Sequence, residues 1–233
     1  MRVEELAKTL DYTVLNPRAT QDDVARVCGE ARELHLAAVC AFPAFLPLMT
    51  QRLRGCDVKV CTVVAFPHGA ELPSSKLACA ERAVSAGADE LDVVMNVSAM
   101  LSGDYRMVRD ELVRLVRAVR ARAVNDARGE VMVKVIIEAP YLTDKQKRLA
   151  CRFVAEAGAD FAKTATGMGT VATVHDVELM RESLPGEVGV KAAGGIRTLE
   201  DASAMINAGA SRLGSSSAVQ ILREHGGVDG TVR

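Results

Sequence analysis

The sequence has no tryptophan and few other aromatic residues, which limits the surfaces it can present. Of its 233 residues, only five are phenylalanine and three are tyrosine. Proteins that bind single-stranded nucleic acid stack the bases on aromatic side chains, so this class of function is disfavoured. Basic residues (29) and acidic residues (30) nearly balance, so the chain also lacks the basic excess of a nucleic-acid or membrane-surface binder.

Metal-binding, disulfide and membrane patterns are missing as well. The six cysteines form no Cys-x-x-Cys pair, and the four histidines have no neighbouring ligand at the usual spacing. We therefore expect reduced thiols and no metal. No apolar run reaches the roughly 18–20 residues that span a bilayer, and the acidic start of the chain is unlike a signal peptide. These absences predict a cytoplasmic enzyme that binds neither membranes nor nucleic acid.

What is present is a regular alternation of short β-branched runs with longer amphipathic stretches. The short runs predict eight strands, at residues 12–15, 38–41, 58–66, 90–97, 131–138, 160–165, 188–193 and 212–215. The longer stretches between them predict helices at residues 21–34, 75–86, 105–123, 144–157, 174–183 and 199–208. No linker or shift in composition interrupts the pattern, which therefore predicts one α/β domain.

A repeated junction supports this reading. The tripeptide Ala-Gly-Ala occurs at 86–88, 157–159 and 208–210, each time between a predicted helix and a predicted strand. Glycine commonly ends helices because it tolerates the left-handed conformation. Eight such units predict a single (β/α)8 TIM barrel over residues 1–225, with a short N-terminal helix and a mobile C-terminal tail at 226–233. A doubly wound open sheet is the alternative, but no Gly-x-Gly-x-x-Gly follows the first strand.

Charged residues inside the predicted strands point to chemistry. Lys134, Lys163, Lys191 and Asp92 all lie within apolar strand runs, so period-two alternation lets them face one barrel interior. Lys134 and Asp92 can be explained as an ion pair that packs the barrel interior, as such pairs sometimes do. Burying two further ammonium groups without partners would cost free energy of folding. Clustered like charges disfavour protonation of one another, and a neutral amine can attack a carbonyl. We therefore expect Lys163 and Lys191 to be catalytic.

Glycine and serine follow the last three predicted strands. In TIM barrels, the loops after the seventh and eighth strands commonly bind phosphate through backbone N–H groups. Ordinary turns would explain any one of these loops, but three on one face favour a phosphate site. The predicted phosphate-binding residues are Gly167, Gly194, Gly195, Gly214, Ser216 and Ser217.

Long motifs in this order resemble those of the deoxyribose-phosphate aldolase family, whose members are Schiff-base (class I) aldolases with a (β/α)8 barrel. The resemblance covers nearly the whole chain. The matching segments are 11–16, 39–40, 66–69, 86–94, 134–138, 157–164, 191–198 and 214–217.

The resemblance implies roles for individual residues. The lysine matching Lys163 forms the imine, and the residues matching Asp92 and Lys191 are the proton donor or acceptor and the tuning ammonium. The resemblance places the phosphate at the glycines and serines named above. We expect the site to be supported by Lys134, Asp11, Thr13, Cys40 and Thr166, with Cys40 as a packing thiol rather than a nucleophile.

The sequence also departs from the family at two places. Met168 follows Gly167 where some members have a lysine, and the tail ends 229–233 without the tyrosine that some members carry. Neither departure touches the lysines or Asp92.

The activity that the resemblance implies is reversible cleavage of 2-deoxy-D-ribose 5-phosphate to acetaldehyde and D-glyceraldehyde 3-phosphate, in a homodimer and without a cofactor. The alternatives are a Schiff-base aldolase for another phosphorylated sugar and a phosphosugar-binding barrel without catalysis.

Overall fold

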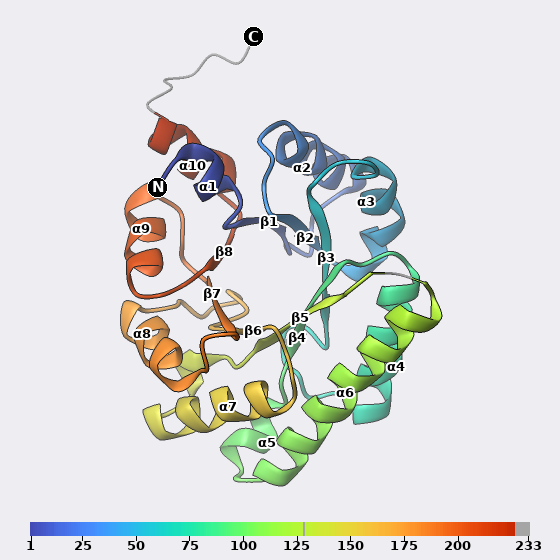
Figure 1. Cartoon of the computed structure of the whole chain (residues 1–233), viewed down its shortest axis with the longest axis vertical. Coiled ribbons are helices and arrows are strands. Elements are labelled where there is room, and N and C mark those ends of the chain that lie inside the picture. The colour runs from blue at the N-terminus through green and yellow to red at the C-terminus, as the bar shows by residue number, and fades with distance from the viewer. Residues whose placement is uncertain (128, 227–233) are drawn as a thin grey trace.

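The computed structural model describes residues 1–127 and 129–226. Eight parallel strands close into a barrel in the order of the sequence, and helices surround it (Figure 1). The strands are β1 (Leu10–Val14), β2 (Ala38–Ala41), β3 (Lys59–Val64), β4 (Glu90–Val94), β5 (Met132–Ile136), β6 (Phe161–Lys163), β7 (Gly189–Ala193) and β8 (Arg212–Ser215). The predicted (β/α)8 barrel is therefore confirmed.

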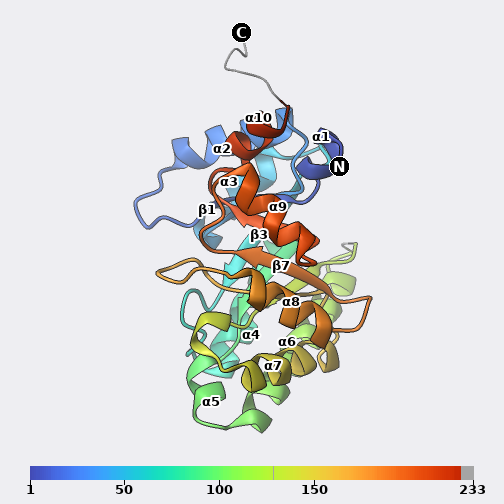
Figure 2. The same cartoon turned by 90° about the vertical axis from the view of Figure 1, so that its left-hand side faces the viewer.

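The helices lie outside the barrel, as Figures 1 and 2 show from two directions. They are α1 (Val3–Ala7), α2 (Gln21–Glu33), α3 (Leu46–Arg52), α4 (Pro73–Ser85), α5 (Val97–Leu101), α6 (Tyr105–Asn125), α7 (Asp144–Glu156), α8 (Val174–Ser183), α9 (Leu199–Asn207) and α10 (Ala218–Gly226), with 3-10 turns η1 (Pro43–Phe45) and η2 (Ala139–Tyr141). Within residues 1–127 and 129–226, no helix is both long and apolar enough to cross a membrane.

Strands β1, β3, β4, β5 and β6 end earlier than the sequence predicts, whereas β2, β7 and β8 end where it predicts. Residues 95–97 and 137–138 were expected to extend β4 and β5, but both strands stop before them. Asn96 instead begins α5, because its side chain accepts a hydrogen bond from the N–H of Ala99 at 2.9 Å. Glu138 has a left-handed backbone with φ of 51°, which turns the chain out of the sheet. Both residues consequently lie in loops at the carboxyl end of the barrel.

Alternation along the strands separates an apolar shell from a polar interior. Leu91 and Val93 of β4 belong to the large core between sheet and helices, whereas Glu90 and Asp92 are also buried but take part in the ion pairs described below. A second, small apolar cluster made by Leu15, Ala38, Cys40, Cys61 and Val63 is separate from the large core. One set of alternate residues thus packs the shell, and the other brings charges together.

The two ends of the described chain meet. Helices α1 and α10 lie side by side in both views (Figures 1 and 2), and the His225 ring nitrogen Nε2 lies 3.0 Å from the carbonyl oxygen of Met1. Gly226 closes α10. The rest of the tail predicted to be mobile, residues 227–233, lies outside the described residues.

Candidate active site

Asp92, in the middle of β4, is the centre of a buried network of charges. Its Oδ1 accepts a hydrogen bond from Nζ of Lys134 at 2.9 Å, and its Oδ2 accepts from Nζ of Lys163 and of Lys191, each at 2.7 Å. Parallel register places these groups together, since Asp92 pairs with Lys134 and Lys163 pairs with Lys191. The structure thus brings together the four residues that the strand pattern singled out.

The network holds Asp92 and Lys191 in charged form. Burial alone would raise the pKa of Asp92, but the ammonium groups of Lys134, Lys163 and Lys191 outweigh it and hold this pKa well below its usual range. Burial alone would lower the pKa of Lys191, but the carboxylates of Asp11 and Asp92 raise it instead. Lys191 donates to Asp11 Oδ2 at 2.5 Å. Lys191 is therefore a permanent positive charge next to Lys163.

Two charged residues of this network were not identified from the sequence. Glu90 forms an ion pair with Lys134 at 2.6 Å, and Arg212 donates to both carboxylate oxygens of Glu90 at 2.7 and 2.8 Å and to Asp11 Oδ1 at 2.6 Å. Both begin their strands, β4 and β8, so they lie at the amino end of the barrel. The same alternation that marked Asp92 could have identified Glu90, two residues earlier.

Lys163 connects this network to an open pocket. It is the last residue of β6, its side chain is 3% exposed, and it lines a cavity of about 620 Å³. The cavity lies at the carboxyl ends of β1, β6, β7 and β8, the end of the barrel at which TIM-barrel enzymes carry their active sites. The buried ammonium groups of Lys134 and Lys191 do not line it.

Most of the predicted phosphate residues line the same cavity. Gly167, Gly194, Gly195, Gly214 and Ser216 do so. Among the described residues, no acceptor is found for the backbone N–H groups of Gly167, Gly194, Gly195 and Ser216. Their N–H groups are therefore available to an anion.

Ser217 differs from the other predicted phosphate residues. It is not part of the cavity wall, and its N–H donates to the hydroxyl of Ser215 at 2.9 Å.

The glycine pair after β7 is needed for the shape of this wall. Gly194 and Gly195 have φ values of 100° and 83°, which side chains other than glycine rarely adopt. A Cβ on Gly195 would lie 2.7 Å from Cγ1 of Val171, and one on Gly194 would lie 2.8 Å from the carbonyl oxygen of Thr170. The loop after β6 thus packs directly against the loop after β7.

Glu138 orders the loop that follows Lys163. Its carboxylate accepts from the N–H of Thr166 at 3.2 Å and from the hydroxyl of Thr170 at 2.6 Å. The Thr166 hydroxyl in turn accepts from the N–H of Met168 at 3.2 Å. Glu138 is a third functional candidate that the sequence did not reveal, since it was expected to continue β5.

The cavity wall also contains arginines that no motif predicted. Arg18, Arg26 and Arg197 line it. Arg26 donates to both carboxylate oxygens of Glu30, at 3.0 and 3.1 Å. The guanidinium groups of Arg18 and Arg197 form no ion pair within the part of the chain that the structure describes. These two arginines are therefore available to a negatively charged ligand in the cavity, whose wall also contains the uncharged Met168.

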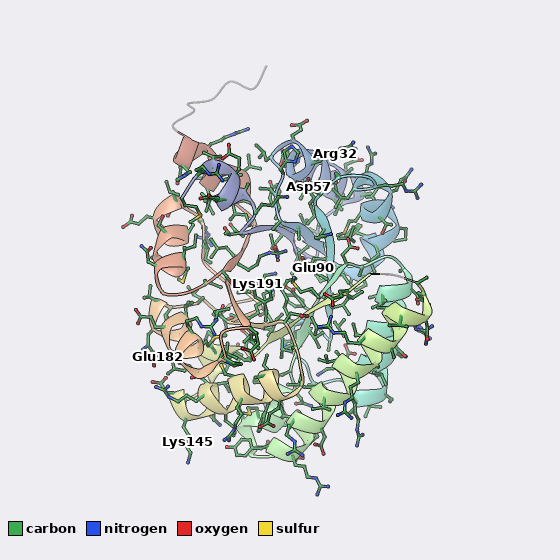
Figure 3. The ribbon with its side chains drawn as sticks, in the orientation of Figure 1. Arg32, Asp57, Glu90, Lys145, Glu182 and Lys191 are labelled. Carbon is green, nitrogen blue, oxygen red and sulfur yellow. The ribbon has the colours of Figure 1, made fainter. Side chains whose placement is uncertain are left out.

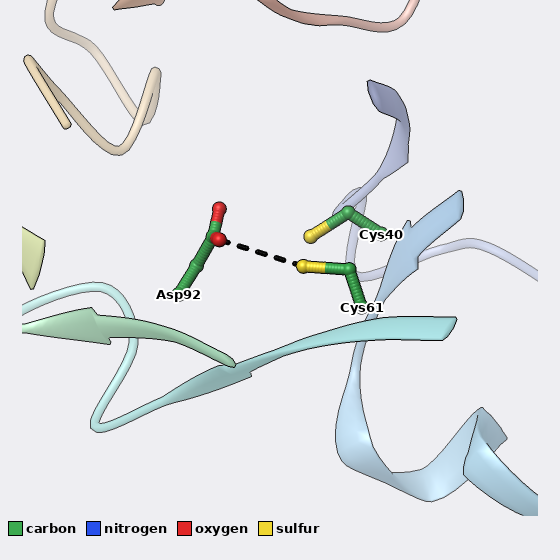
Figure 4. Close-up of side chains that lie close together, drawn as sticks. All are labelled: Cys40, Cys61 and Asp92. Atoms are coloured by element: carbon green, nitrogen blue, oxygen red, sulfur yellow. Dashed lines mark hydrogen bonds between the residues drawn. The ribbon is translucent and has the colours of Figure 1, made fainter. Parts of the chain in front are cut away.

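The remaining predicted residues lie beside the network. Thr13 lines the cavity, and its hydroxyl donates to the carbonyl oxygen of Asp11 at 3.2 Å. Cys40 is fully buried opposite Cys61 on the neighbouring strand, and Cys61 donates to Asp92 Oδ1 at 3.4 Å (Figure 4). Cys40 thus lies in a small apolar cluster next to the charges.

Two sets of buried side chains lie close enough to be considered as metal ligands. They are Cys40, Cys61 and Asp92, and Asp11, Cys61 and Glu90. Every one of these carboxylates already accepts hydrogen bonds from ammonium or guanidinium groups. A divalent cation here would lie next to several positive charges, so these residues do not fit a metal site.

Comparison with known proteins identifies relatives over almost the whole chain. The family model described as "DeoC/LacD family aldolase" matches residues 6–224. The deoxyribose-phosphate aldolase of Caldanaerobacter subterraneus is 48% identical over 220 residues, 94% of this chain and 93% of the relative.

Solved structures of aldolases also match this chain over most of its length. The aldolase designated QR15 is 38% identical with a TM-score of 0.86, and the match covers 94% of this chain and 95% of that one. The deoxyribose phosphate aldolase from Aeropyrum pernix is 34% identical with a TM-score of 0.87, covering 97% and 92%, and its title describes a tetramer.

Proposed function

Because the chain belongs to the DeoC/LacD family of aldolases, we propose that it reversibly cleaves 2-deoxy-D-ribose 5-phosphate to acetaldehyde and D-glyceraldehyde 3-phosphate. The observation that carries the proposal is the position of Lys163. Its amine is held 2.7 Å from Asp92, next to the permanent charge of Lys191, in the wall of a cavity whose loops offer free N–H groups. This arrangement joins a nucleophile for an aldehyde to a site for a phosphate.

Lys163 is the proposed nucleophile. Its neutral amine attacks the C1 aldehyde carbon of the open-chain sugar, and loss of water from the resulting carbinolamine gives a protonated imine. Removal of the proton from the C3 hydroxyl then breaks the C2–C3 bond, and the bonding electrons move into the imine to form an enamine. D-Glyceraldehyde 3-phosphate leaves. Protonation of the enamine at C2 and hydrolysis of the imine release acetaldehyde and regenerate Lys163, with no cofactor consumed.

Asp92 is the proposed proton carrier, acting through a water molecule and within the hydrogen-bond network of Lys134. Lys163 is one of three ammonium groups that lower the pKa of Asp92. While Lys163 is neutral, as the free amine or as the carbinolamine, Asp92 has one positive neighbour fewer, and its affinity for a proton is higher. The carboxylate is therefore a better base during formation of the carbinolamine than it would be beside three charged lysines.

The proposed phosphate site is formed by Gly167, Gly194, Gly195, Gly214 and Ser216, with Thr166 fixing the loop after β6. Ser217, whose N–H donates to Ser215, is left out of it. Free N–H groups bind the phosphate oxygens, and Arg18 and Arg197 supply positive charge. Cys61 takes no part in the chemistry, and Cys40, Thr13 and Asp11 shape the interior side of the site.

Borohydride trapping tests the proposal. Incubation with acetaldehyde and borohydride, followed by peptide mapping, should give a reduced adduct on Lys163. Lys145, on the exposed side of α7, provides a matched control. Lys163→Met should abolish the adduct, whereas Lys145→Met should not. An adduct elsewhere, or none, would contradict the mechanism.

Cleavage assays test the substrate. 2-Deoxy-D-ribose 5-phosphate should be cleaved far faster than ketose phosphates. Preference for a ketose phosphate would assign the same site to a different aldol reaction, and binding without turnover would identify a barrel that has lost catalysis.

We also infer that the chain forms a homo-oligomer, specifically a homodimer, in the cytoplasm. The tetramer named for the Aeropyrum pernix relative supports assembly of identical chains. Light scattering coupled to size-exclusion chromatography tests this, and a monomer at micromolar concentration would contradict it.

A further inference from the structure

Every strand of the barrel contributes an ionisable side chain to one interior network. All of these side chains are buried, and they extend from the amino end of the barrel to the cavity at its carboxyl end. They are Asp11 (β1), Cys40 (β2), Cys61 (β3), Glu90 and Asp92 (β4), Lys134 (β5), Lys163 (β6), Lys191 (β7) and Arg212 (β8).

The charges in this network do not balance. It contains four cationic groups, three lysines and Arg212, against the three carboxylates of Asp11, Glu90 and Asp92. The two thiols respond differently to this site. Burial raises the pKa of Cys61 well above its usual value, whereas hydrogen bonding with Cys61 lowers the pKa of Cys40, an effect that burial and the negative charge of Asp92 oppose. With both thiols protonated and every lysine, arginine and carboxylate of the network charged, the interior has one uncompensated positive charge, which is unfavourable in a medium of low polarity.

Of the three interior lysines, Lys163 has the fewest contacts with carboxylates. Lys134 lies within 4 Å of three carboxylates, at 2.6 Å from Glu90, 2.9 Å from Asp92 and 3.8 Å from Asp11. Lys191 has two, at 2.5 and 2.7 Å. Among residues 1–127 and 129–226, Lys163 has only Asp92 Oδ2, an oxygen that it shares with Lys191. The lysine that lies on the cavity is thus also the one with the fewest carboxylate contacts.

Arg212 and Glu90 contribute to this charge balance from the amino end of the barrel, opposite the cavity. The Arg212 guanidinium takes up both oxygens of Glu90 and one of Asp11, so these carboxylates are only partly available to the lysines. Neither Arg212 nor Glu90 lines the cavity. Figure 3 shows Glu90 and Lys191 near the axis of the barrel, far from labelled surface residues such as Glu182.

We propose that Glu90 and Arg212 are positioning residues that set the protonation of Lys163 through the charge balance of the barrel interior. The proposal rests on the proposed role of Lys163 as the Schiff-base nucleophile. Arg212 supplies the fourth positive charge of the interior, which favours the neutral form of Lys163. Glu90 supplies the third negative charge, which limits the excess of positive charge to one.

Opposite substitutions test the proposal. Arg212→Gln removes a positive charge and should move the pH profile of borohydride trapping at Lys163 to higher pH. Glu90→Gln removes a negative charge and should move it to lower pH. Each shift should be about one pH unit, or about tenfold in trapping rate on the rising limb of the profile. The double variant has the same net charge in the barrel interior as the wild type, so its pH profile should lie close to that of the wild type.

Glu182→Gln is the matched surface control. Glu182 forms an exposed pair with Arg148 at 3.6 Å, and its loss changes the total charge as Glu90→Gln does. Its profile should not move. Single variants that shift in the same direction, or do not shift while remaining folded by circular dichroism, would overturn the proposal. Absence of any Lys163 adduct in the wild type would instead contradict the proposed function.

A measurement on the wild type covers the case in which the single variants do not fold. With ¹⁵N-labelled lysine, NMR at neutral pH should show one interior amine in the neutral form and two as ammonium, and Lys163→Met should remove the neutral signal. Three ammonium signals would overturn the proposal. So would a thiolate absorbance near 240 nm that Cys40→Ala abolishes, because Cys40 would then carry the compensating charge.

Discussion

At the scale of single residues, the protonation of the site depends on which amines donate to the same carboxylate oxygen. Lys163 and Lys191 both donate to Asp92 Oδ2, so a change in one amine alters the environment of the other. Lys191 keeps its proton because Asp11 and Asp92 raise its pKa despite burial. The difference between the proposed nucleophile and the tuning charge thus arises from one additional carboxylate contact.

Replacing Lys191 with methionine tests this difference. Lys191→Met removes the positive charge that opposes protonation of Lys163, so the activity optimum should move to higher pH. The rate at neutral pH should fall at least tenfold, which corresponds to about 1.4 kcal/mol. The pH dependence of kcat/KM for 2-deoxy-D-ribose 5-phosphate measures this. An unchanged rate and profile would show that Lys191 does not tune the nucleophile.

Replacing Gly195 should separate phosphate binding from imine formation. Gly195→Ala introduces a Cβ at a φ of 83° and 2.7 Å from Val171, which displaces the loop whose N–H groups are free. KM for the phosphorylated substrate should rise about tenfold or more, whereas turnover of 2-deoxyribose without phosphate should change much less. Gly186→Ala is a matched control, because nothing lies within 4 Å of a Cβ at that position. Equal losses on both substrates would place the phosphate elsewhere.

At the scale of elements, the sequence predicts long periodic segments well and short ones poorly. Alternation placed all eight strands, and the Ala-Gly-Ala junctions end α4, α7 and α9 as expected, with φ of 106°, 74° and 108° at the glycines. Helices α3, α5 and α10 were not predicted. The first two have only seven and five residues, too few for a helical period to be recognised.

The same limit applies to the site. Lysines within apolar strands are conspicuous, so Lys134, Lys163 and Lys191 could be predicted. Glu90 and Arg212 begin their strands, where charged residues are common, so their charge alone does not distinguish them. Alternation with Asp92 is a signal for Glu90, whereas for Arg212 the closed barrel is needed to show that it faces inward. Arg18 and Arg197 lie in loops whose position depends on the whole fold.

The contact between α4 and α6 depends on a buried ion pair. Lys76 donates to Glu111 Oε2 at 2.9 Å, both side chains are at most 3% exposed, and Glu111 Oε1 has no hydrogen-bond partner. Lys76→Met would leave a buried carboxylate without its cation, so the free energy of unfolding should fall by about 3–5 kcal/mol. Replacing both residues, Lys76→Met with Glu111→Leu, should recover most of this loss. Urea denaturation of the wild type and the two variants measures it, and an equal loss in the double variant would contradict the explanation.

At the scale of the whole molecule, the barrel interior couples folding to pH. Asp11 and Asp92 have lowered pKa values, because the surrounding cations outweigh the effect of burial. Lys134 and Lys191 have raised pKa values, because the surrounding carboxylates do the same. The carboxylates therefore stabilise the fold above their unfolded pKa near 3.9, and the lysines do so below theirs near 10.4. Between these limits the contribution of these four groups should be constant.

The acid limb gives a test of this coupling. As the pH falls below about 4, the unfolded chain binds protons that buried Asp11 and Asp92 do not bind, so the free energy of unfolding falls. Each such carboxylate contributes about 1.4 kcal/mol per pH unit. Asp11→Asn should lower overall stability, because Lys191 and Arg212 lose a partner, but it should also reduce the slope between pH 2.5 and 4 by about that amount. Urea denaturation across this range, for wild type and variant, measures both quantities. An unchanged slope would mean that Asp11 takes up its proton in the folded protein at the same pH as in the unfolded chain, and that the interior cations do not hold it ionised.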